Sequence, residues 1–127
     1  MCILLVEDEP AIREVLAEVL REAGHNTLDV DNGDSAARLI ESPPTPFTLL
    51  VTDVHIPGSR NGMQLAAMMR RRHPSVPVIF ITGLPGALNY AVRRDVDMLL
   101  AKPFTPSELV RAVEQALPEP RNDCRQS

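Results

Sequence analysis

The sequence predicts an α/β protein built as a three-layer sandwich, in which a five-stranded parallel sheet lies between two layers of helices. Three observations support this class. Short apolar runs alternate with helical patterns along the chain, which is the order expected of a parallel sheet with right-handed crossovers. Most of these runs are continuously apolar, as in strands covered on both faces. The run over residues 27–30 alternates instead, which is typical of an edge strand, so we predict the strand order 2-1-3-4-5.

The first strand and the first helix follow from the first 24 residues. Residues 3–6 are apolar and predict the strand. A helix is predicted over residues 10–23, because Pro10 suits a first helical turn and Gly24 suits a helix end. Its apolar stripe follows the helical spacing and consists of Ala11, Ile12, Val15, Leu16, Val19, Leu20 and Ala23. The stripe predicts an amphipathic helix.

The next segment predicts an edge strand, a short helix and a central strand. Asn32-Gly33 follows the edge strand and turns into a helix over residues 35–41. Residues 42–46 contain three prolines and predict a loop, because proline lacks the backbone donor that a helix needs. The third strand then ends at Asp53.

The second half of the chain begins with the turn-forming residues 57–62 and a helix over residues 63–72. Residues 76–82 predict the fourth strand. Residues 83–97 contain Gly83, Pro85 and Gly86, so we expect a short or irregular fourth helix there.

The last predicted elements are a strand over residues 98–101 and a well-marked helix. Thr105-Pro106-Ser107-Glu108 has the pattern of a capping box with proline at the first helical position. We therefore predict one domain over residues 1–118 and a flexible tail over residues 119–127.

The composition excludes several classes of protein. A chain of 127 residues with 44% hydrophobic content and a net charge of -4 supports one core and gives no basic stripe for nucleic acid. The one basic run, residues 70–72, ends a predicted helix, where cations favour the helix dipole. Two cysteines do not form a disulfide framework, and the first apolar run is too short for a signal peptide or a membrane span. We expect a cytoplasmic protein without nucleic-acid or membrane partners.

Four strands end on residues that can bind metal or phosphate. The first strand runs into Glu7 and Asp8, the third into Asp53, the fourth into Thr82 and the fifth into Lys102. Ligands bind outside the carboxyl ends of parallel strands, so we expect these side chains to form one site. Neighbouring carboxylates repel one another, and a hard cation with oxygen ligands such as Mg²⁺ relieves that repulsion. A carboxylate, an ammonium group and a hydroxyl around such a metal are suited to phosphoryl transfer through an aspartyl phosphate.

Each of these residues also has an ordinary structural interpretation. Asp53 alone is more typical of a helix cap or a turn, Thr82 of a β-strand, and Lys102 of a solvated loop. Glu7 and Asp8 favour the start of the first helix through its dipole in either case. The functional interpretation therefore depends on the four strand ends occurring together.

The remaining histidines and methionines are given structural roles. His25, His55 and His73 have no metal-ligand spacing, and their side chains are expected on the surface. The methionines of the third helix, Met63, Met68 and Met69, are expected to fill the core.

With these motifs in order, the sequence resembles the receiver domains of two-component response regulators and hybrid histidine kinases. The resemblance covers about residues 2–117 and is carried by Glu7-Asp8-Glu9, Asp53 with Pro57, Thr82-Gly83 and Lys102-Pro103-Phe104. It is similar to a subgroup of stand-alone receivers and C-terminal receivers of hybrid kinases. The resemblance implies the flavodoxin-like receiver fold.

The resemblance also implies a role for each acidic residue. Asp53 is implied to accept a phosphoryl group from a histidine kinase or a histidine phosphotransfer protein. Asp8 and Asp53 are implied to bind Mg²⁺ directly, Glu7 through water and His55 through its backbone carbonyl. We accordingly expect a phosphorelay receiver that signals through protein partners, as a monomer or weak dimer without an output domain of its own. Its only catalysis would be its own phosphorylation and slow dephosphorylation.

The chain differs from the family pattern around the signalling residues. Lys102 is implied to bond the phosphoryl group and Thr82 to move toward it. The family usually has an aromatic residue three positions before the lysine, where this chain has Leu99. The loop after Pro57 is one residue longer, and the interval from Thr82 to Lys102 is short. With Leu99 at that position, no aromatic ring can change its rotamer on signalling. We therefore expect the movement of Thr82 to reorder residues 83–97.

Two alternatives stay open from the sequence. A haloacid-dehalogenase-type phosphatase also uses an aspartyl nucleophile with Mg²⁺, but that class requires a second aspartate two residues later, where this chain has His55. A phosphate-independent interaction module of the same fold is the other alternative, and Leu99 is the residue that favours it.

Overall fold

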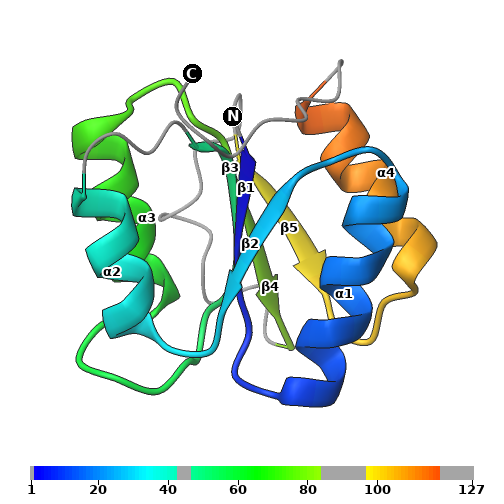
Figure 1. Cartoon of the computed structure of the whole chain (residues 1–127), viewed down its shortest axis with the longest axis horizontal. Coiled ribbons are helices and arrows are strands. Elements are labelled where there is room, and N and C mark those ends of the chain that lie inside the picture. Colours follow the sequence, from blue (N-terminus) through cyan, green and yellow to red (C-terminus); the bar gives the residue numbers. More distant parts are fainter. Residues whose placement is uncertain (1, 43–46, 84–96, 118–127) are drawn as a thin grey trace.

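The computed structural model describes residues 2–42, 47–83 and 97–117, and it has the α/β architecture that the sequence predicts. Five strands form one sheet in the order β2-β1-β3-β4-β5, as predicted, and all four pairings are parallel (Figure 1). The strands are β1 (Cys2–Val6), β2 (Thr27–Val30), β3 (Phe47–Asp53), β4 (Val78–Thr82) and β5 (Met98–Ala101). Because the pairings are parallel, the carboxyl ends of the strands lie along one edge of the sheet.

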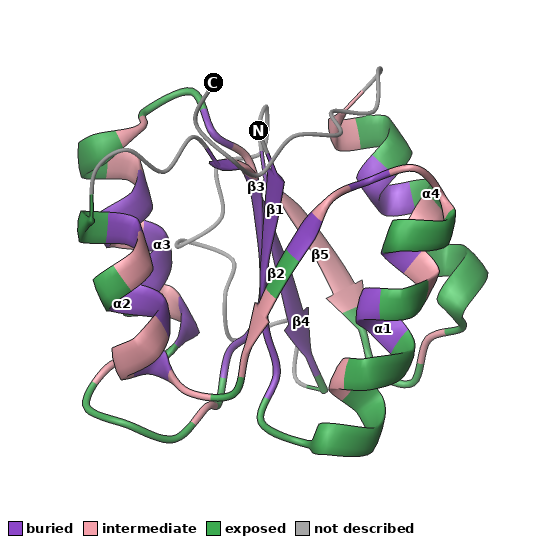
Figure 2. Cartoon of the chain, in the orientation of Figure 1, coloured by how far each residue is buried: buried purple, intermediate pink, exposed green. Residues whose placement is uncertain are grey.

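The described helices cover both faces of the sheet. They are α1 (Pro10–Glu22), α2 (Gly33–Glu41), α3 (Gly62–Arg72) and α4 (Pro106–Ala116). Figure 1 shows α1 and α4 on one face and α2 and α3 on the other, and Figure 2 shows the buried strands between them. Each face has its own apolar core. The predicted fourth helix in residues 83–97 and the predicted tail over residues 119–127 lie almost entirely outside the described residues.

Side-chain caps fix where three of the helices begin. The Thr105 and Glu108 capping box of α4 is present as predicted. Helix α2 begins two residues earlier than predicted, because the Asn32 side chain accepts a hydrogen bond from Ser35 N at 2.7 Å. A second capping box between Asn61 and Gln64 starts α3.

Only part of the apolar stripe of helix α1 is buried. Leu16, Ala17 and Leu20 are buried against the sheet, whereas Ile12 is 40% exposed and Val15 is 50% exposed. The upstream half of the stripe therefore forms part of the molecular surface near the carboxyl edge of the sheet.

His25 is buried, so its predicted position on the surface is wrong. The residue is 2% exposed, and neither ring nitrogen has a hydrogen-bond partner within the described part of the chain. Burial lowers the pKa of His25, and the carboxylate of Glu114 opposes this only in part. The neutral form is therefore the one that packs against α1 and β2.

We expect this histidine to make the folded protein less stable in mild acid. The unfolded chain binds a proton at His25 near pH 6.5, whereas the folded chain resists it, so the unfolded state binds more protons below that pH. The urea midpoint should consequently fall as the pH is lowered from about 7.5 to about 5.5, which crosses the ordinary histidine pKa. His25→Leu should flatten this part of the profile, and the half-exposed His73→Gln should not. An unchanged profile in His25→Leu would contradict the assignment.

Candidate functional site

Asp53 lies at the centre of the carboxyl edge of the sheet. It is the last residue of β3, is 5% exposed, and pairs in register with Ile81 of β4. Each carboxylate oxygen has a partner: Lys102 Nζ lies 2.5 Å from Oδ2, and the backbone N–H of His55 donates to Oδ1 at 3.2 Å. The carboxylate is therefore held in a fixed orientation at the end of the central strand.

The two acidic residues after β1 lie beside Asp53. Oxygen atoms of Glu7, Asp8 and Asp53 lie within 4.8 Å of one another, and this is the only such group among residues 2–42, 47–83 and 97–117. Glu7 is 2% exposed, whereas Asp8 is open to solvent. Three carboxylates at this spacing form the hard oxygen donor set that suits Mg²⁺. The residues present thus fit the metal that the sequence predicts.

The electrostatics of the site reflect this crowding of acids. Burial raises the pKa of Glu7, and the nearby Asp8 and Asp53 carboxyl groups act in the same direction. Burial alone would lower the pKa of Lys102, but its hydrogen bond and charge interaction with Asp53 raise it. Lys102 is therefore protonated at neutral pH, and its charge offsets part of the negative charge of these acids.

Thr82 and Lys102 lie at the ends of β4 and β5, on the side of β3 opposite β1. Thr82 ends β4 and is 3% exposed, and its carbonyl accepts a hydrogen bond from Lys102 N at 2.9 Å. In register, Thr82 lies beside Ala101, the last residue of β5. The structure therefore brings all four predicted strand ends to one edge.

Leu99 points into the core side of the sheet that α2 and α3 cover. It lies beside Phe80 in register and is partly buried against the apolar cluster of that face. The position at which the family resemblance implies an aromatic residue is thus occupied by an aliphatic packing residue. Residues 84–96, where we expected a reordering on signalling, lie outside the described residues.

His55 begins the loop between β3 and α3, residues 54–61. Its amide is used by Asp53, as described above, and its side chain is exposed as expected. The structure shows no contact for its carbonyl within the described part of the chain, so the predicted role as a metal ligand stays a prediction.

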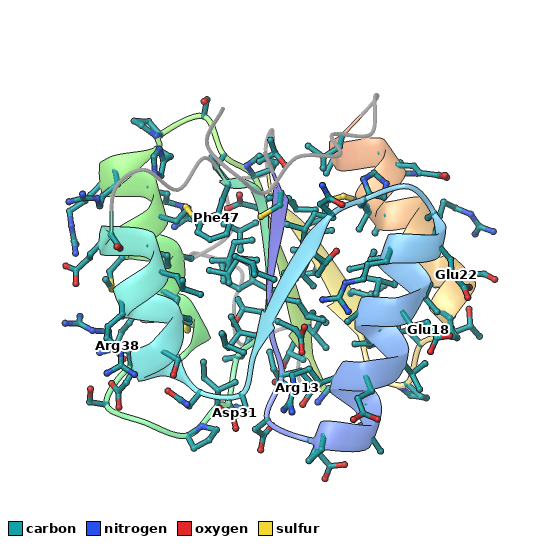
Figure 3. All side chains as sticks on the ribbon, in the orientation of Figure 1. Arg13, Glu18, Glu22, Asp31, Arg38 and Phe47 are labelled. Carbon is teal, nitrogen blue, oxygen red and sulfur yellow. The ribbon has the colours of Figure 1, made fainter. Side chains whose placement is uncertain are left out.

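Sequence analysis missed an arginine that ties the site to the edge strand. Figure 3 labels this residue, Arg13 of α1. It donates to the carbonyl of Glu7 at 3.2 Å, and its Nε lies 3.3 Å from Asp29 of β2. Asp29 also pairs with Arg21 at 2.9 Å. These contacts join residues up to 16 positions apart, so no local motif in the sequence marked them.

An apolar groove also adjoins the site and was missed. It runs between α1 and the segment after β5, and its walls include Ile12, Val15, Phe104 and Pro106. Glu7 and Lys102 lie at its end, so the groove opens directly onto the candidate site. The sequence carries no local signal for the groove, because a helical stripe does not show which of its residues a neighbouring element covers.

Comparison with known proteins identifies the family. The profile described as "Response regulator receiver domain" matches residues 3–114, which is most of the chain. The chain belongs to the response regulator receiver domain family. Receiver domains of this family are parts of two-component systems.

Relatives of this receiver include both stand-alone and multidomain proteins. It is 34% identical to the response regulator receiver protein CpdR of Brucella abortus, over 91% of this chain and 95% of CpdR. It is 36% identical to the response regulator protein FleR of Pseudomonas aeruginosa, but spans only 23% of that protein's length. A longer relative of this kind therefore carries further sequence that this chain does not match.

Solved receiver structures have the same fold. The crystal structure of a response regulator receiver protein from Sinorhizobium medicae superposes with a TM-score of 0.86, at 28% identity, and the match covers 93% of this chain and 94% of that one. The receiver domain of the hybrid histidine kinase CckA superposes with a TM-score of 0.75, at 32% identity, over 92% of this chain and 99% of that one. The flavodoxin-like receiver fold predicted from the sequence is thus confirmed.

Among the described residues, no helix is both long and apolar enough to cross a membrane. This finding agrees with the short apolar runs of the sequence.

Proposed function

We propose that this receiver is a phosphorylatable switch or relay that accepts a phosphoryl group on Asp53. The observation that carries the proposal is the arrangement around this side chain. Lys102 Nζ lies 2.5 Å from Asp53 Oδ2, and the carboxylates of Glu7 and Asp8 lie on the other side of Asp53. This carboxylate lies between a fixed cation and a set of carboxylates that can bind a metal. Such an arrangement suits a nucleophile for phosphoryl transfer, because positive charge can stabilise the phosphoryl oxygens on both sides.

In the proposed reaction, an oxygen of Asp53 attacks the phosphorus atom of a phosphohistidine. A new O–P bond forms while the N–P bond breaks, and the imidazole leaves with its electron pair and gains a proton. Lys102 then exchanges its contact with Asp53 for one with a phosphoryl oxygen. The hydroxyl of Thr82, at the adjacent strand end, would contact the same group.

Mg²⁺ would be held directly by Asp8 and Asp53, by Glu7 through water and by the carbonyl of His55. When bound, it would neutralise the acids and the phosphoryl oxygens together. Hydrolysis of the aspartyl phosphate by water resets the switch, and we propose no other enzymatic activity.

The chemistry of the bond can be tested directly. After incubation with acetyl phosphate and Mg²⁺, treatment with sodium borohydride should convert the phosphorylated aspartate to homoserine. Peptide mapping should then find homoserine at position 53. Modification at another aspartate, or an acid-stable phosphate on a serine or threonine, would contradict the proposal.

We further propose that the apolar groove receives a helix of the phosphodonor, a histidine kinase or a histidine phosphotransfer protein. A phosphohistidine can reach Asp53 only if the surface that carries it covers the surroundings of the site, and the groove is continuous with that site through Glu7 and Lys102. Ile12 and Val15 are 40% and 50% exposed, so they offer apolar surface to such a helix.

Val15→Asp should separate protein donors from small ones. We expect it to lower the rate constant kcat/KM for transfer from a phosphotransfer protein about tenfold, the order of effect of an apolar contact residue. Phosphorylation by acetyl phosphate should be unchanged, because the reacting groups are intact. Leu28→Asp, on an apolar residue outside the groove that is 36% exposed, is the matched control. Equal effects of Val15→Asp on both donors, or no effect on the protein donor, would contradict this docking mode.

A phosphatase of the haloacid dehalogenase type gains no support from the site. That class requires a second carboxylate two residues after the nucleophile, and the structure has there the exposed side chain of His55. We also propose that the phosphorylated receiver signals by binding a downstream protein partner, as its membership of the response regulator family implies.

A further inference from the structure

The loop over residues 54–61 is fastened to the start of helix α2. The carboxylate of Asp34 accepts hydrogen bonds from the amide of Ser59 at 3.2 and 3.3 Å and from its hydroxyl at 2.5 Å. The amide of Gly33 donates to the carbonyl of Pro57 at 2.9 Å. We call these contacts the Asp34 clip. They join two segments 25 positions apart in the sequence.

Two glycines allow the clip to close. A Cβ atom at Gly33 would lie 1.9 Å from the carbonyl oxygen of Arg60, so only glycine permits the loop backbone to approach α2 this closely. Gly58 has φ +109 and lies against the Asp34 carboxylate, where a Cβ would be 3.1 Å from Oδ2. The hydrogen bonds from Ser59 lower the pKa of Asp34, so the clip carries a full negative charge at neutral pH.

The same loop holds the phosphoacceptor at its other end. The amide of His55 donates to Asp53 Oδ1 at 3.2 Å, and His55 is only four residues before Ser59. Two backbone hydrogen bonds hold the ends of the loop. Val54 N donates to the carbonyl of Ile81 at 3.1 Å, and Gly62 N donates to the carbonyl of Val54 at 3.0 Å. A shift of the loop at Ser59 would therefore move the donor that orients Asp53.

We propose that Asp34 is a positioning residue for phosphorylation: it fixes Ser59, and the loop in turn fixes the His55 amide against Asp53. This inference rests on the proposed function of Asp53. It assigns a role to Asp34 and Ser59, neither of which lies among the site carboxylates or contacts Lys102. The clip also couples the position of α2 to the geometry of the site.

The test compares variants of the whole chain. Asp34→Ala removes the carboxylate acceptor of the clip and leaves the backbone hydrogen bond from Gly33 to Pro57. Asp34→Asn keeps one acceptor oxygen and loses the charge, and Ser59→Ala removes the hydroxyl alone. Asn32→Ala is the matched control, because it removes the cap of the same helix without removing a contact to the loop. Each variant is measured for Mg²⁺ affinity by calorimetry, for the rate of phosphorylation by acetyl phosphate, and for amide exchange of His55 and Ser59 in metal-free protein.

We expect Asp34→Ala to weaken Mg²⁺ binding and to slow phosphorylation at saturating Mg²⁺ by about tenfold, the lower end of the effects seen for partners that orient metal ligands. The His55 and Ser59 amides should exchange about fivefold faster, as for the loss of one ordinary hydrogen bond. Asp34→Asn should restore most of each property. The double variant Asp34→Ala with Ser59→Ala should be no worse than Asp34→Ala, since both act on one contact.

Two results would overturn the inference. One is an Asp34→Ala protein with the Mg²⁺ affinity and phosphorylation rate of the wild type. The other is an equal loss in Asn32→Ala, which would reduce Asp34 to general support of α2. If the wild type itself took up no phosphate, the proposed function would fail instead, and the Mg²⁺ titration and the exchange of the His55 amide would still decide whether the clip positions the loop.

Discussion

Asp53→Asn is expected to abolish phosphorylation of this receiver by any donor. The amide has no ionised oxygen to attack phosphorus, and no other described carboxylate lies at the centre of the sheet edge with Lys102 on one side and the acidic cluster on the other. The measurement is incorporation of labelled phosphate from a phosphodonor in the presence of Mg²⁺. We expect incorporation to fall to background.

The fold of this variant should be intact. Asparagine has the shape of aspartate and can still accept the hydrogen bond from His55, and Lys102 is 41% exposed, so water can solvate its charge. Although the Asp53 side chain is only 7% exposed, losing its charge also relieves repulsion with Glu7 and Asp8, which offsets the loss of the ion pair. Asp31→Asn, an exposed acid at the end of β2, is the control for loss of one charge. Undiminished labelling of Asp53→Asn would refute the assignment of the phosphoacceptor.

Asp8→Asn is expected to abolish detectable Mg²⁺ binding and, with it, rapid phosphorylation. It removes a direct ligand from a set of three carboxylates whose oxygens lie within 4.8 Å. The same change relieves repulsion in the metal-free protein, where burial and the two neighbouring acids already raise the pKa of Glu7. We therefore expect a higher melting temperature without Mg²⁺ than the wild type has, together with lost metal affinity.

Asp8→Asn is thus expected to raise the melting temperature and to abolish Mg²⁺ binding, and a general loss of structure would not produce both changes. Glu18→Gln, an exposed position on α1, changes the net charge equally and should alter neither property. Calorimetric titration that gave Asp8→Asn the affinity of the wild type would show that Asp8 is not a ligand. A lower melting temperature would show that Asp8 contributes to the fold beyond its charge.

The fold and the central residues of the site could be predicted because both depend on local patterns. Continuous apolar runs specify buried parallel strands, and the topology then brings the residues after those runs to one edge. Glu7, Asp8, Asp53, Thr82 and Lys102 were found by this reasoning, and the structure places them together.

The features that were missed depend on contacts between distant segments. Nothing near His25 in the sequence indicates that α1, β2 and α4 enclose its ring. The Asp34 clip joins positions 25 apart, and the buried ion pair of Arg70 with Asp97 joins positions 27 apart. A helical stripe likewise does not reveal how much of it a neighbouring element covers, which is why the exposure of Ile12 and Val15 was not predicted.

The central claim, that the carboxyl edge of this sheet is a Mg²⁺-dependent phosphoacceptor site, is tested most directly by intact-mass spectrometry of the wild-type protein after incubation with acetyl phosphate. With Mg²⁺, the account predicts a single added phosphoryl group that is lost on standing at neutral pH, as acyl phosphates are. Without Mg²⁺, the adduct should be absent or greatly reduced. An unmodified mass under both conditions would contradict the account and favour a phosphate-independent interaction module.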